Sequence, residues 1–416
     1  MLFGSSGIRR RFDQTLVNTA LDVGAVLGAD FRDIIIGTDT RTTSPLLARL
    51  IVSGVIGSGG QAYCAGIAPT PAIAFTTRLK KAGCMITASH NPEEYNGLKL
   101  FNPDGSAFTL AQQAATEDAL KTPRLADWKH QGASYPFDAL TPYKAAILDA
   151  VTIRDGLTVV LDCGNGAGSV LTPSLLADAG AKPVCLTCDP AGQFSRKSEP
   201  LPEYLGYVGE MVKKTGARCA VVHDGDADRM MAFDNRGRFI DGDHLLLLFA
   251  SHLGAKRVVT TSDASMIIEE VAEVHRTPVG DSYVSEELLR WGEFGGEPSG
   301  AWIFPKHSYC PDGPFAAALF CEIASTTDIA AELDTMPSYP ILRESIPCET
   351  ARETVLALGA TSPTDGIRIA AEDGWYLVRA SGTEHKIRIT AEGTTLPAAK
   401  VMLERGRMLV KQGKAA

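Results

Sequence analysis

The chain has 416 residues, of which 45% are hydrophobic and 21% charged; this length exceeds what a single hydrophobic core serves, so we expect three or four domains. Its formal net charge of -9 argues against a nucleic-acid partner, because phosphate backbones require clustered lysine and arginine. No apolar run reaches the roughly 18 residues of a membrane span, and the N-terminus lacks a signal-peptide core, so we expect a cytoplasmic protein with no membrane partner.

An apolar strand that ends in aspartate, followed by a helix, recurs three times. The copies run from Ile34 to Asp39, from Leu157 to Asp162 and from Arg257 to Asp263. Strands that are apolar on both faces and alternate with helices predict a mainly parallel α/β sheet. The simplest interpretation is three diverged copies of one α/β domain.

The last quarter of the chain has a different pattern. Glu372-Asp373-Gly374 separates two short apolar runs and predicts a hairpin, residues 387–389 predict a third strand, and residues 396–410 predict an amphipathic helix. We therefore expect three similar α/β domains with mixed, mainly parallel sheets plus a smaller C-terminal α+β domain, all around one central cleft. The predicted boundaries are 1–140, 141–240, 241–338 and 339–416, with linkers at 140–142, near 241–242 and at 336–340.

A polar turn follows the apolar run that ends at Ile86. It reads Thr-Ala-Ser-His-Asn-Pro over residues 87–92. Pro92 cannot continue a sheet ladder, and the residue before it is displaced from helix, so Ser89 should present its hydroxyl on an exposed turn next to His90. Taken alone, the pattern is more typical of a solvated turn.

Three aspartates alternate at positions 224, 226 and 228. In an extended segment Asp224, Asp226 and Asp228 would point the same way, and their mutual repulsion favours a hard divalent cation held by oxygen ligands. A calcium-binding EF-hand loop does not fit, because Arg229 occupies the glycine position and Asn235 the position of the bidentate glutamate. A solvated acidic turn remains the alternative.

Two further loops combine polar side chains with glycine turns. The first contains Arg379, Ser381, Gly382 and Thr383, which offer a guanidinium, two hydroxyls and free main-chain N–H groups suited to phosphate. In the second, Glu297 and Ser299 lie among Gly296, Pro298 and Gly300, and they offer a carboxylate and a hydroxyl suited to sugar hydroxyls. Each could also be a plain turn.

Other ligand motifs are incomplete. Nine scattered cysteines do not form a disulfide pattern, and the single C-x-x-C pair of Cys185 and Cys188 lacks the second pair of a zinc ribbon. The glycine-rich turn at 164–168 lacks the third glycine of a dinucleotide site, where Ser169 stands.

The four polar loops, in this order and over nearly the whole chain, resemble the signature loops of the α-D-phosphohexomutase family. The resemblance implies that Ser89 carries a transferable phosphoryl group and that the aspartates bind one Mg²⁺ per chain together with it. It implies that Glu297 and Ser299 select sugar hydroxyls. It also implies that the loop at 379–383 grips the phosphate that is not reacting.

The resemblance extends to segments near these loops. The family's N-terminal segment corresponds to residues 5–9 and its N-G-x-K motif to residues 96–99, which makes Arg9 and Lys99 candidates for charge stabilisation and proton handling. His90 is a further catalytic candidate, and Arg229 could hold phosphate beside the metal. The implied reaction passes through a sugar bisphosphate, so a sugar 1,6-bisphosphate is expected as activator, with sugar phosphate as the only partner of a monomer or homodimer.

Two features bear on acid/base chemistry and on the substrate. Many relatives carry histidine where this chain has Ala301, so His307 is considered as a substitute. Residues 277–284 resemble phosphoglucosamine mutases more than most phosphomannomutases and phosphoglucomutases. We therefore expect conversion of glucosamine 6-phosphate to glucosamine 1-phosphate, with phosphomannomutase/phosphoglucomutase activity as the alternative. A metal-dependent phosphatase and a non-catalytic sugar-phosphate sensor are the competing classes.

Overall fold

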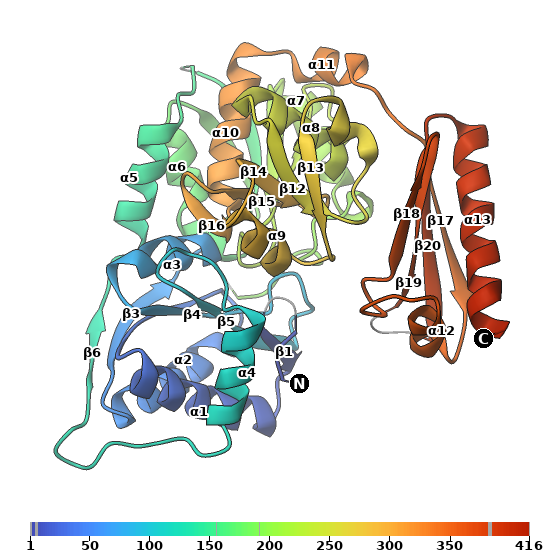
Figure 1. Ribbon diagram of the computed structural model, residues 1–416. Coiled ribbons are helices and arrows are strands. Elements are labelled where there is room, and N and C mark those ends of the chain that lie inside the picture. The colour runs from blue at the N-terminus through green and yellow to red at the C-terminus, as the bar shows by residue number, and fades with distance from the viewer. Residues whose placement is uncertain (1, 5–6, 155, 191, 382–384, 416) are drawn as a thin grey trace.

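The structure is a computed structural model that describes residues 2–4, 7–154, 156–190, 192–381 and 385–415. Four β-sheets, each covered by its own helices, follow one another along the chain (Figure 1). In this view the C-terminal sheet and its long helix stand to one side of the other three sheets. The predicted fold class is confirmed.

The first sheet has the strand order β1-β5-β4-β2-β3-β6. Its strands are β1 (Ile8–Arg11), β2 (Asp33–Thr38), β3 (Gln61–Ile67), β4 (Ala82–Ile86), β5 (Tyr95–Phe101) and β6 (Ala133–Pro136). Its helices are α1 (Gln14–Asp30), α2 (Ser44–Gly57), α3 (Thr70–Thr76), the 3₁₀ helix η1 (Thr77–Leu79) and α4 (Leu110–Ala119). Side-chain caps fix two of the helix starts, since Asp13 accepts from the Leu16 N–H and Thr109 forms a capping box with Gln112.

The second sheet has the order β11-β10-β9-β7-β8. Its strands are β7 (Thr158–Asp162), β8 (Lys182–Leu186), β9 (Cys219–His223), β10 (Met230–Phe233) and β11 (Phe239–Ile240). Its helices are α5 (Leu140–Ala150), η2 (Ala167–Val170), α6 (Thr172–Asp178), η3 (Pro202–Tyr204) and α7 (Gly206–Thr215).

The third sheet has the order β13-β12-β14-β15-β16. Its strands are β12 (Arg257–Thr261), β13 (Glu273–Thr277), β14 (Phe294–Glu297), β15 (Ala301–Phe304) and β16 (Ser308–Pro311). Its helices are α8 (Gly242–Leu253), η4 (Met266–Glu270), α9 (Asp281–Leu288), α10 (Gly313–Thr326) and α11 (Ile329–Thr335).

These three sheets share one topology. In each, the first parallel strand (β2, β7 or β12) pairs in parallel with a strand that ends at a polar loop (β4, β9 or β14). The next strand in the chain returns antiparallel beside it (β5, β10 or β15). Because the loop-bearing strand has the same place in every sheet, the repeated topology agrees with the interpretation of three diverged copies.

The fourth sheet is antiparallel throughout, in the order β17-β20-β19-β18. Its strands are β17 (Ile341–Pro347), β18 (Ile367–Ala371), β19 (Gly374–Ala380) and β20 (Lys386–Gly393), and its helices are α12 (Ala351–Ala357) and α13 (Leu396–Ala415). The predicted hairpin, third strand and closing helix are confirmed. Strand β17 was not predicted from the sequence.

The hydrophobic cores divide the molecule differently from the sheets. One continuous cluster runs through the first three sheets, from Ile35 and Met85 through Tyr143 and Val159 to Trp302. The fourth sheet packs on α12 and α13 around a separate cluster. The first three sheets are therefore held together by shared apolar burial, which the C-terminal domain does not join.

One predicted linker is wrong. Residues 140–142 form the first turn of α5 rather than a connection, because proline is tolerated in a first turn and Tyr143 and Ile147 are buried in the shared core. The segment at 336–340 does lie between α11 and β17 without regular structure. None of the helices in the described ranges is long and apolar enough to cross a membrane.

Helices α1 and α2 pack through glycines, which gives a test of this packing. A Cβ atom added to Gly54 would lie 2.2 Å from the Leu21 carbonyl oxygen, whereas one added to Gly57 in the same helix would meet only Leu125 Cδ2 at 3.3 Å. We expect Gly54→Ala to lower the free energy of unfolding by about 1–3 kcal/mol through overpacking, measured by urea denaturation. The control Gly57→Ala should leave stability unchanged or raise it slightly. Equal stability of the two variants would contradict the close packing of these helices.

Candidate active site

The polar loops of the first two sheets meet at the carboxyl ends of their strands. The turn that carries Ser89 follows β4, and the loop that carries the three aspartates follows β9. Ser89 Oγ donates a hydrogen bond of 2.9 Å to Asp224 Oδ2 across 135 positions of sequence. Crevices at the carboxyl ends of parallel strands are the usual binding sites of α/β folds, and the structure brings these two predicted motifs together there.

Ser89 lies on a turn, as predicted, but its side chain is not exposed. The residue is only 1% exposed, because residues of the second sheet cover it. Its φ of +50° is in the left-handed region that serine rarely adopts, and its N–H donates to Thr87 Oγ1 at 2.8 Å. His90 Nδ1 lies 3.4 Å from Ser89 Oγ.

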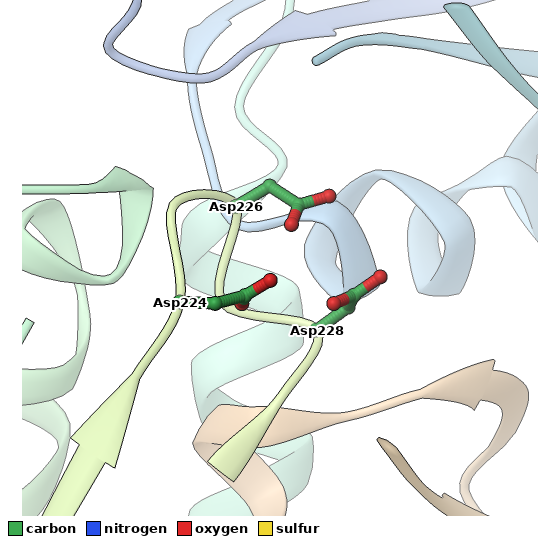
Figure 2. Close-up of side chains that lie close together, drawn as sticks. All are labelled: Asp224, Asp226 and Asp228. Carbon is green, nitrogen blue, oxygen red and sulfur yellow. The ribbon is translucent and has the colours of Figure 1, made fainter. Parts of the chain in front are cut away.

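The three aspartates converge, although not in the way the sequence predicts. Residues 224–228 form a turn, with Ala227 at a φ of +56°, rather than an extended segment. The turn directs the side chains of Asp224, Asp226 and Asp228 toward the same space (Figure 2). One carboxylate oxygen from each lies within 4.8 Å of the others, and all three residues are buried.

The donor set of this cluster fits a hard divalent cation. Among the described residues, Asp226 Oδ1 and Asp228 Oδ1 are buried and accept no hydrogen bond. Carboxylate oxygens without partners are the ligands that Mg²⁺ prefers, together with phosphate oxygens and water. The part of the chain that the structure describes has no other group of this kind, and Cys185 and Cys188 do not form one.

Lys99 neutralises part of the charge of the aspartates. Its Nζ donates to Asp226 Oδ2 at 2.8 Å and also to Asp228 Oδ2. Burial disfavours the ammonium, but these carboxylates outweigh it and raise the pKa of Lys99 above its ordinary value. Lys99 is therefore a fixed cation beside the cluster, which places it where the sequence predicted.

The aspartates differ in their protonation. Burial and the charges of the other two raise the pKa of Asp224. Burial also acts on Asp226, but there the Lys99 ammonium and the Thr70 hydroxyl, at 2.5 Å, hold the pKa below its ordinary value. Carboxylates at this distance disfavour three full negative charges unless a further cation is present.

Two arginines lie near His90 and Ser89. The Arg229 guanidinium, burial and Arg9 together lower the pKa of His90 to about 2, so the imidazole is neutral. The Arg229 main-chain N–H donates to Asp224 Oδ1 at 3.2 Å, and its side chain makes an ion pair of 3.7 Å with Glu199. Within the described ranges, Arg9 Nε on β1 is buried without a hydrogen-bond partner. The site thus offers guanidinium groups suited to phosphate oxygens.

The third sheet contributes Glu297, at the end of β14. Glu297 is 6% exposed and accepts the Gly280 N–H at 2.8 Å, with Ser299 Oγ 3.4 Å from its other oxygen. Burial and the nearby charge of Asp281 raise its pKa to about 8. The Arg229 charge acts on the same carboxyl, which places the predicted sugar-binding pair next to the loop of the three aspartates.

The predicted phosphate-binding residues of the C-terminal domain are not joined to this site. Arg379 is the penultimate residue of β19 and Ser381 follows the strand, whereas Gly382 and Thr383 lie outside the described residues. In the described part of the chain, no hydrogen bond or ion pair links Arg379 or Ser381 to the loops of the first three sheets. The domain is instead attached through Glu392, which accepts hydrogen bonds from Ser265 Oγ and, at 2.8 Å, from the Met266 N–H.

The suggestion that His307 replaces the histidine absent at position 301 is wrong. The His307 ring stacks on Phe75 with centroids 4.7 Å apart and packs against Phe315 at the same distance. Burial lowers its pKa to about 4, and its nearest acidic partner is Asp312 at 3.5 Å. It belongs to an aromatic cluster rather than to the aspartate site.

Sequence reasoning missed three residues that hold the site together. Thr70, at the start of α3, donates through both hydroxyl and N–H to Asp226. Arg41 and Ser198 both donate to the Ser89 carbonyl. The position of Arg41, two residues after the aspartate that ends the first apolar strand, is the one signal in the sequence; Thr70 and Ser198 lie in segments without any motif.

Comparisons with known proteins agree with this geometry. Models of the phosphoglucomutase/phosphomannomutase family match four consecutive parts of the chain: domain I at residues 1–126, domain II at 137–237, domain III at 241–339 and the C-terminal domain at 345–408. The chain is 41% identical to a "Probable phosphoglucosamine mutase" of Methanosarcina acetivorans, over 94% of this chain and 95% of the relative. It is also 41% identical to a protein of the same name from Methanothermobacter thermautotrophicus, over 98% and 97%.

Solved structures share the fold. A phosphoglucomutase/phosphomannomutase family protein of Burkholderia thailandensis superposes with a TM-score of 0.88 at 24% identity, over 99% of this chain and 97% of that one. The N-acetylphosphoglucosamine mutase of Aspergillus fumigatus, in complex with GlcNAc-6P and magnesium, superposes with a TM-score of 0.62 at 16% identity, over 99% and 96%. On the four matched domains and the full-length relatives, the chain belongs to the phosphoglucomutase/phosphomannomutase family, the α-D-phosphohexomutases.

Proposed function

We propose that the protein is a Mg²⁺-dependent phosphoglucosamine mutase that interconverts glucosamine 6-phosphate and glucosamine 1-phosphate through a phosphorylated Ser89. The observation that carries the proposal is the 2.9 Å hydrogen bond from Ser89 Oγ to Asp224 within the buried aspartate cluster. The names of the archaeal relatives support the choice of sugar. Phosphomannomutase/phosphoglucomutase activity, for which the family models are named, is the alternative.

The reaction needs a nucleophile and a place for the charge that moves with the phosphoryl group. Ser89 Oγ releases the group to a sugar hydroxyl and later accepts it back from the other end of the bisphosphorylated sugar. The bound Mg²⁺ would neutralise the phosphoryl oxygens and lower the barrier electrostatically. Asp224, Asp226 and Asp228 would hold that ion, one per chain, since the described residues form a single cluster of this kind.

The surrounding side chains then have distinct roles. Lys99 lies next to both Asp226 and Asp228, where an ammonium stabilises charge developing at the transferring group. Arg229 and Arg9 face the same region and are suited to phosphate oxygens. Neutral His90 lies within 3.4 Å of Ser89 Oγ and would orient this hydroxyl through a hydrogen bond.

Recognition of the sugar is assigned to the other two loops. Glu297 and Ser299 offer acceptors and a donor for sugar hydroxyls beside Arg229. Arg379, Ser381, Gly382 and Thr383 would hold the phosphate that is not reacting. A sugar 1,6-bisphosphate would activate the enzyme by loading Ser89 at the start, and we place the reaction in the cytoplasm, where sugar phosphates are made and used.

Ser89→Ala should abolish the covalent phosphoryl group and lower turnover by several orders of magnitude, because no other described side chain donates to Asp224 from the same position. Peptide mass analysis after incubation with glucose 1,6-bisphosphate locates the group on Ser89 in the wild type. The control Ser53→Ala changes an exposed serine on α2 and should leave both measurements unchanged. Normal turnover by Ser89→Ala would refute the assignment.

Asp226→Asn should weaken Mg²⁺ binding and lower kcat by orders of magnitude rather than raise KM alone, because the metal acts on the transition state. Calorimetric titration with Mg²⁺ and steady-state kinetics measure the two effects. The control Asp234→Asn changes a buried aspartate of the same sheet that binds Arg238 instead, and it should retain Mg²⁺ affinity. Full activity in the presence of a chelator would contradict a metal-dependent reaction.

Incubation with labelled sugar 6-phosphates separates the candidate activities and identifies the sugar. Isomerised product supports a mutase, free phosphate a phosphatase, and unchanged ligand a sensor. We expect the kcat/KM for glucosamine 6-phosphate to exceed those for glucose and mannose 6-phosphate, because the negative charge of Asp281 near Glu297 favours a protonated amino group. A tenfold preference for glucose or mannose phosphate, about 1.4 kcal/mol in the transition state, would replace the assignment with the alternative.

A further inference from the structure

A fully buried arginine holds the turn that carries the reactive serine. Arg41 follows β2 and is 2% exposed. Its Nε donates to Asp39 Oδ2 at 3.0 Å. Its other four N–H groups donate, at 2.6–3.0 Å, to the main-chain carbonyls of Ser89, Asn91, Pro92 and Tyr95. All five donors of the guanidinium are thus used, four of them on one turn.

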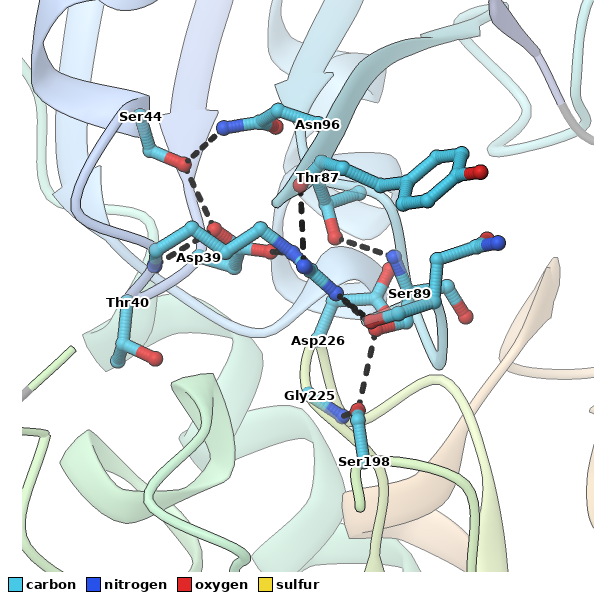
Figure 3. A network of polar contacts seen from close by, with 12 residues as sticks. Asp39, Thr40, Ser44, Thr87, Ser89, Asn96, Ser198, Gly225 and Asp226 are labelled. Carbon is cyan, nitrogen blue, oxygen red and sulfur yellow. Dashed lines mark hydrogen bonds and ion pairs between the residues drawn. The ribbon is translucent and has the colours of Figure 1, made fainter. Parts of the chain in front are cut away.

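The charge of Arg41 is balanced by Asp39 and not by an aspartate of the cluster at 224–228. Asp39 accepts from Arg41 and from Ser44 Oγ at 2.7 Å, and Ser44 in turn accepts from Asn96 at 2.9 Å (Figure 3). A buried guanidinium is stable only with such a complete set of partners. Arg41 therefore has no free N–H for a substrate, and its contacts point to positioning.

A second donor reaches the same carbonyl from the neighbouring domain. Ser198 Oγ donates to the Ser89 carbonyl at 3.1 Å and accepts the Gly225 N–H at 2.9 Å. Gly225 lies between the first two aspartates of the metal loop, and a Cβ atom there would approach the Ser89 carbonyl and Ser198 Oγ to 2.8 Å. One hydroxyl thus links the serine turn to the metal loop (Figure 3).

In the second sheet another arginine, Arg196, holds the loop of the three aspartates in a similar way. Arg196 pairs with Asp162, the aspartate that ends β7, at 2.8 Å. It donates to the carbonyl of His223, the residue before Asp224, at 2.6 Å, and to the Ser198 carbonyl at 3.2 Å. Because β7 is the counterpart of β2, each of the two loops has an aspartate–arginine pair at the same place, and Ser198 connects them.

The contacts of Arg41 and Ser198 hold Ser89 in a backbone conformation that serine rarely adopts. The φ of +50° at Ser89 carries a conformational cost, and the hydroxyl points at Asp224 only while the main chain keeps that conformation. We infer that Arg41 and Ser198 are positioning residues, which hold the Ser89 carbonyl so that Oγ stays aimed at the metal loop throughout the phosphoryl transfers. This inference rests on the proposed mutase function.

Arg41→Lys tests the inference, because an ammonium has three N–H groups and cannot span four carbonyls. We expect kcat to fall at least tenfold while KM for the sugar phosphate stays within about twofold, since the change affects the transferring group and not sugar binding. Loading of Ser89 from glucose 1,6-bisphosphate, followed by intact mass in a single turnover, should slow to the same extent.

Arg276→Lys is the matched control. Arg276 also donates to three main-chain carbonyls, those of Thr261, Ala264 and Ser265, but these lie at the end of β12 and in the loop after it. Arg276→Lys should keep the wild-type loading rate, and its melting temperature shows the effect of replacing a partly buried arginine that binds main-chain carbonyls. An Arg41→Lys loss no larger than that of the control would overturn the inference.

If Arg41→Lys does not fold, Ser198→Ala tests the inference instead, because this variant removes only one hydroxyl. We expect a smaller fall in the loading rate, with KM unchanged. In the double variant the two losses should not multiply, because both side chains act on one carbonyl. If Ser198→Ala and Arg41→Lys both load Ser89 at the wild-type rate, this inference is overturned and the proposed function is not. A wild type that isomerises no sugar phosphate would overturn the proposed function and this inference with it.

Discussion

Three buried carboxylates within 4.8 Å of one another are the constraint on which the rest of the site depends. At an effective dielectric constant of 20, two unit charges 4 Å apart repel by about 4 kcal/mol. The chain answers this with cations from other segments: Lys99 on β5 contacts two of the carboxylates, and Arg229 lies beside the third. Two carboxylate oxygens still have no partner among the described residues. The same electrostatics that favour a metal also suit the proposed site to the negative charge of a phosphoryl group.

The architecture can hold such a cluster because the first three sheets share a core. Ser89 and Asp224 belong to different sheets, yet their hydrogen bond requires a fixed relative position. Continuous apolar burial through Met85, Tyr143, Val159 and Trp302 provides that rigidity, since close-packed interiors do not deform gradually. Thr70 adds a direct polar tie from α3 to the metal loop. Packing over the whole of the first three domains therefore fixes the geometry at one hydroxyl.

Much of the fold and of the candidate site can be predicted from the sequence, because these features depend on residues that are close together in the chain. Apolar runs identify the parallel strands, and residue types identify Ser89, the three aspartates and Glu297. Other features depend on contacts between distant segments and leave no pattern: the burial of Ser89 comes from the second sheet, and Arg41 and Ser198 act through main-chain carbonyls that any residue provides. The turn at 224–228 was misjudged because alternation suggests an extended strand, whereas Ala227 at positive φ folds it back. The proline at 142 suggested a linker, and tertiary burial of Tyr143 and Ile147 made it a helix start.

The hydrogen bonds of Glu392 attach the C-terminal domain at one end of its sheet. Glu392 pairs with Trp375 in the register of β19 and β20, accepts its indole N–H, and binds Ser265 and Met266 of the third domain. Ala380, next to the predicted phosphate-binding loop, pairs with Ile387 at the opposite end, about five residues or roughly 17 Å along the strand. A rotation of about 10° about the Glu392 contacts would move the loop end by about 3 Å at that lever length. In the proposed reaction the bisphosphorylated sugar has to turn around, and such a rotation would free its distal phosphate while the shared core keeps Ser89 against Asp224.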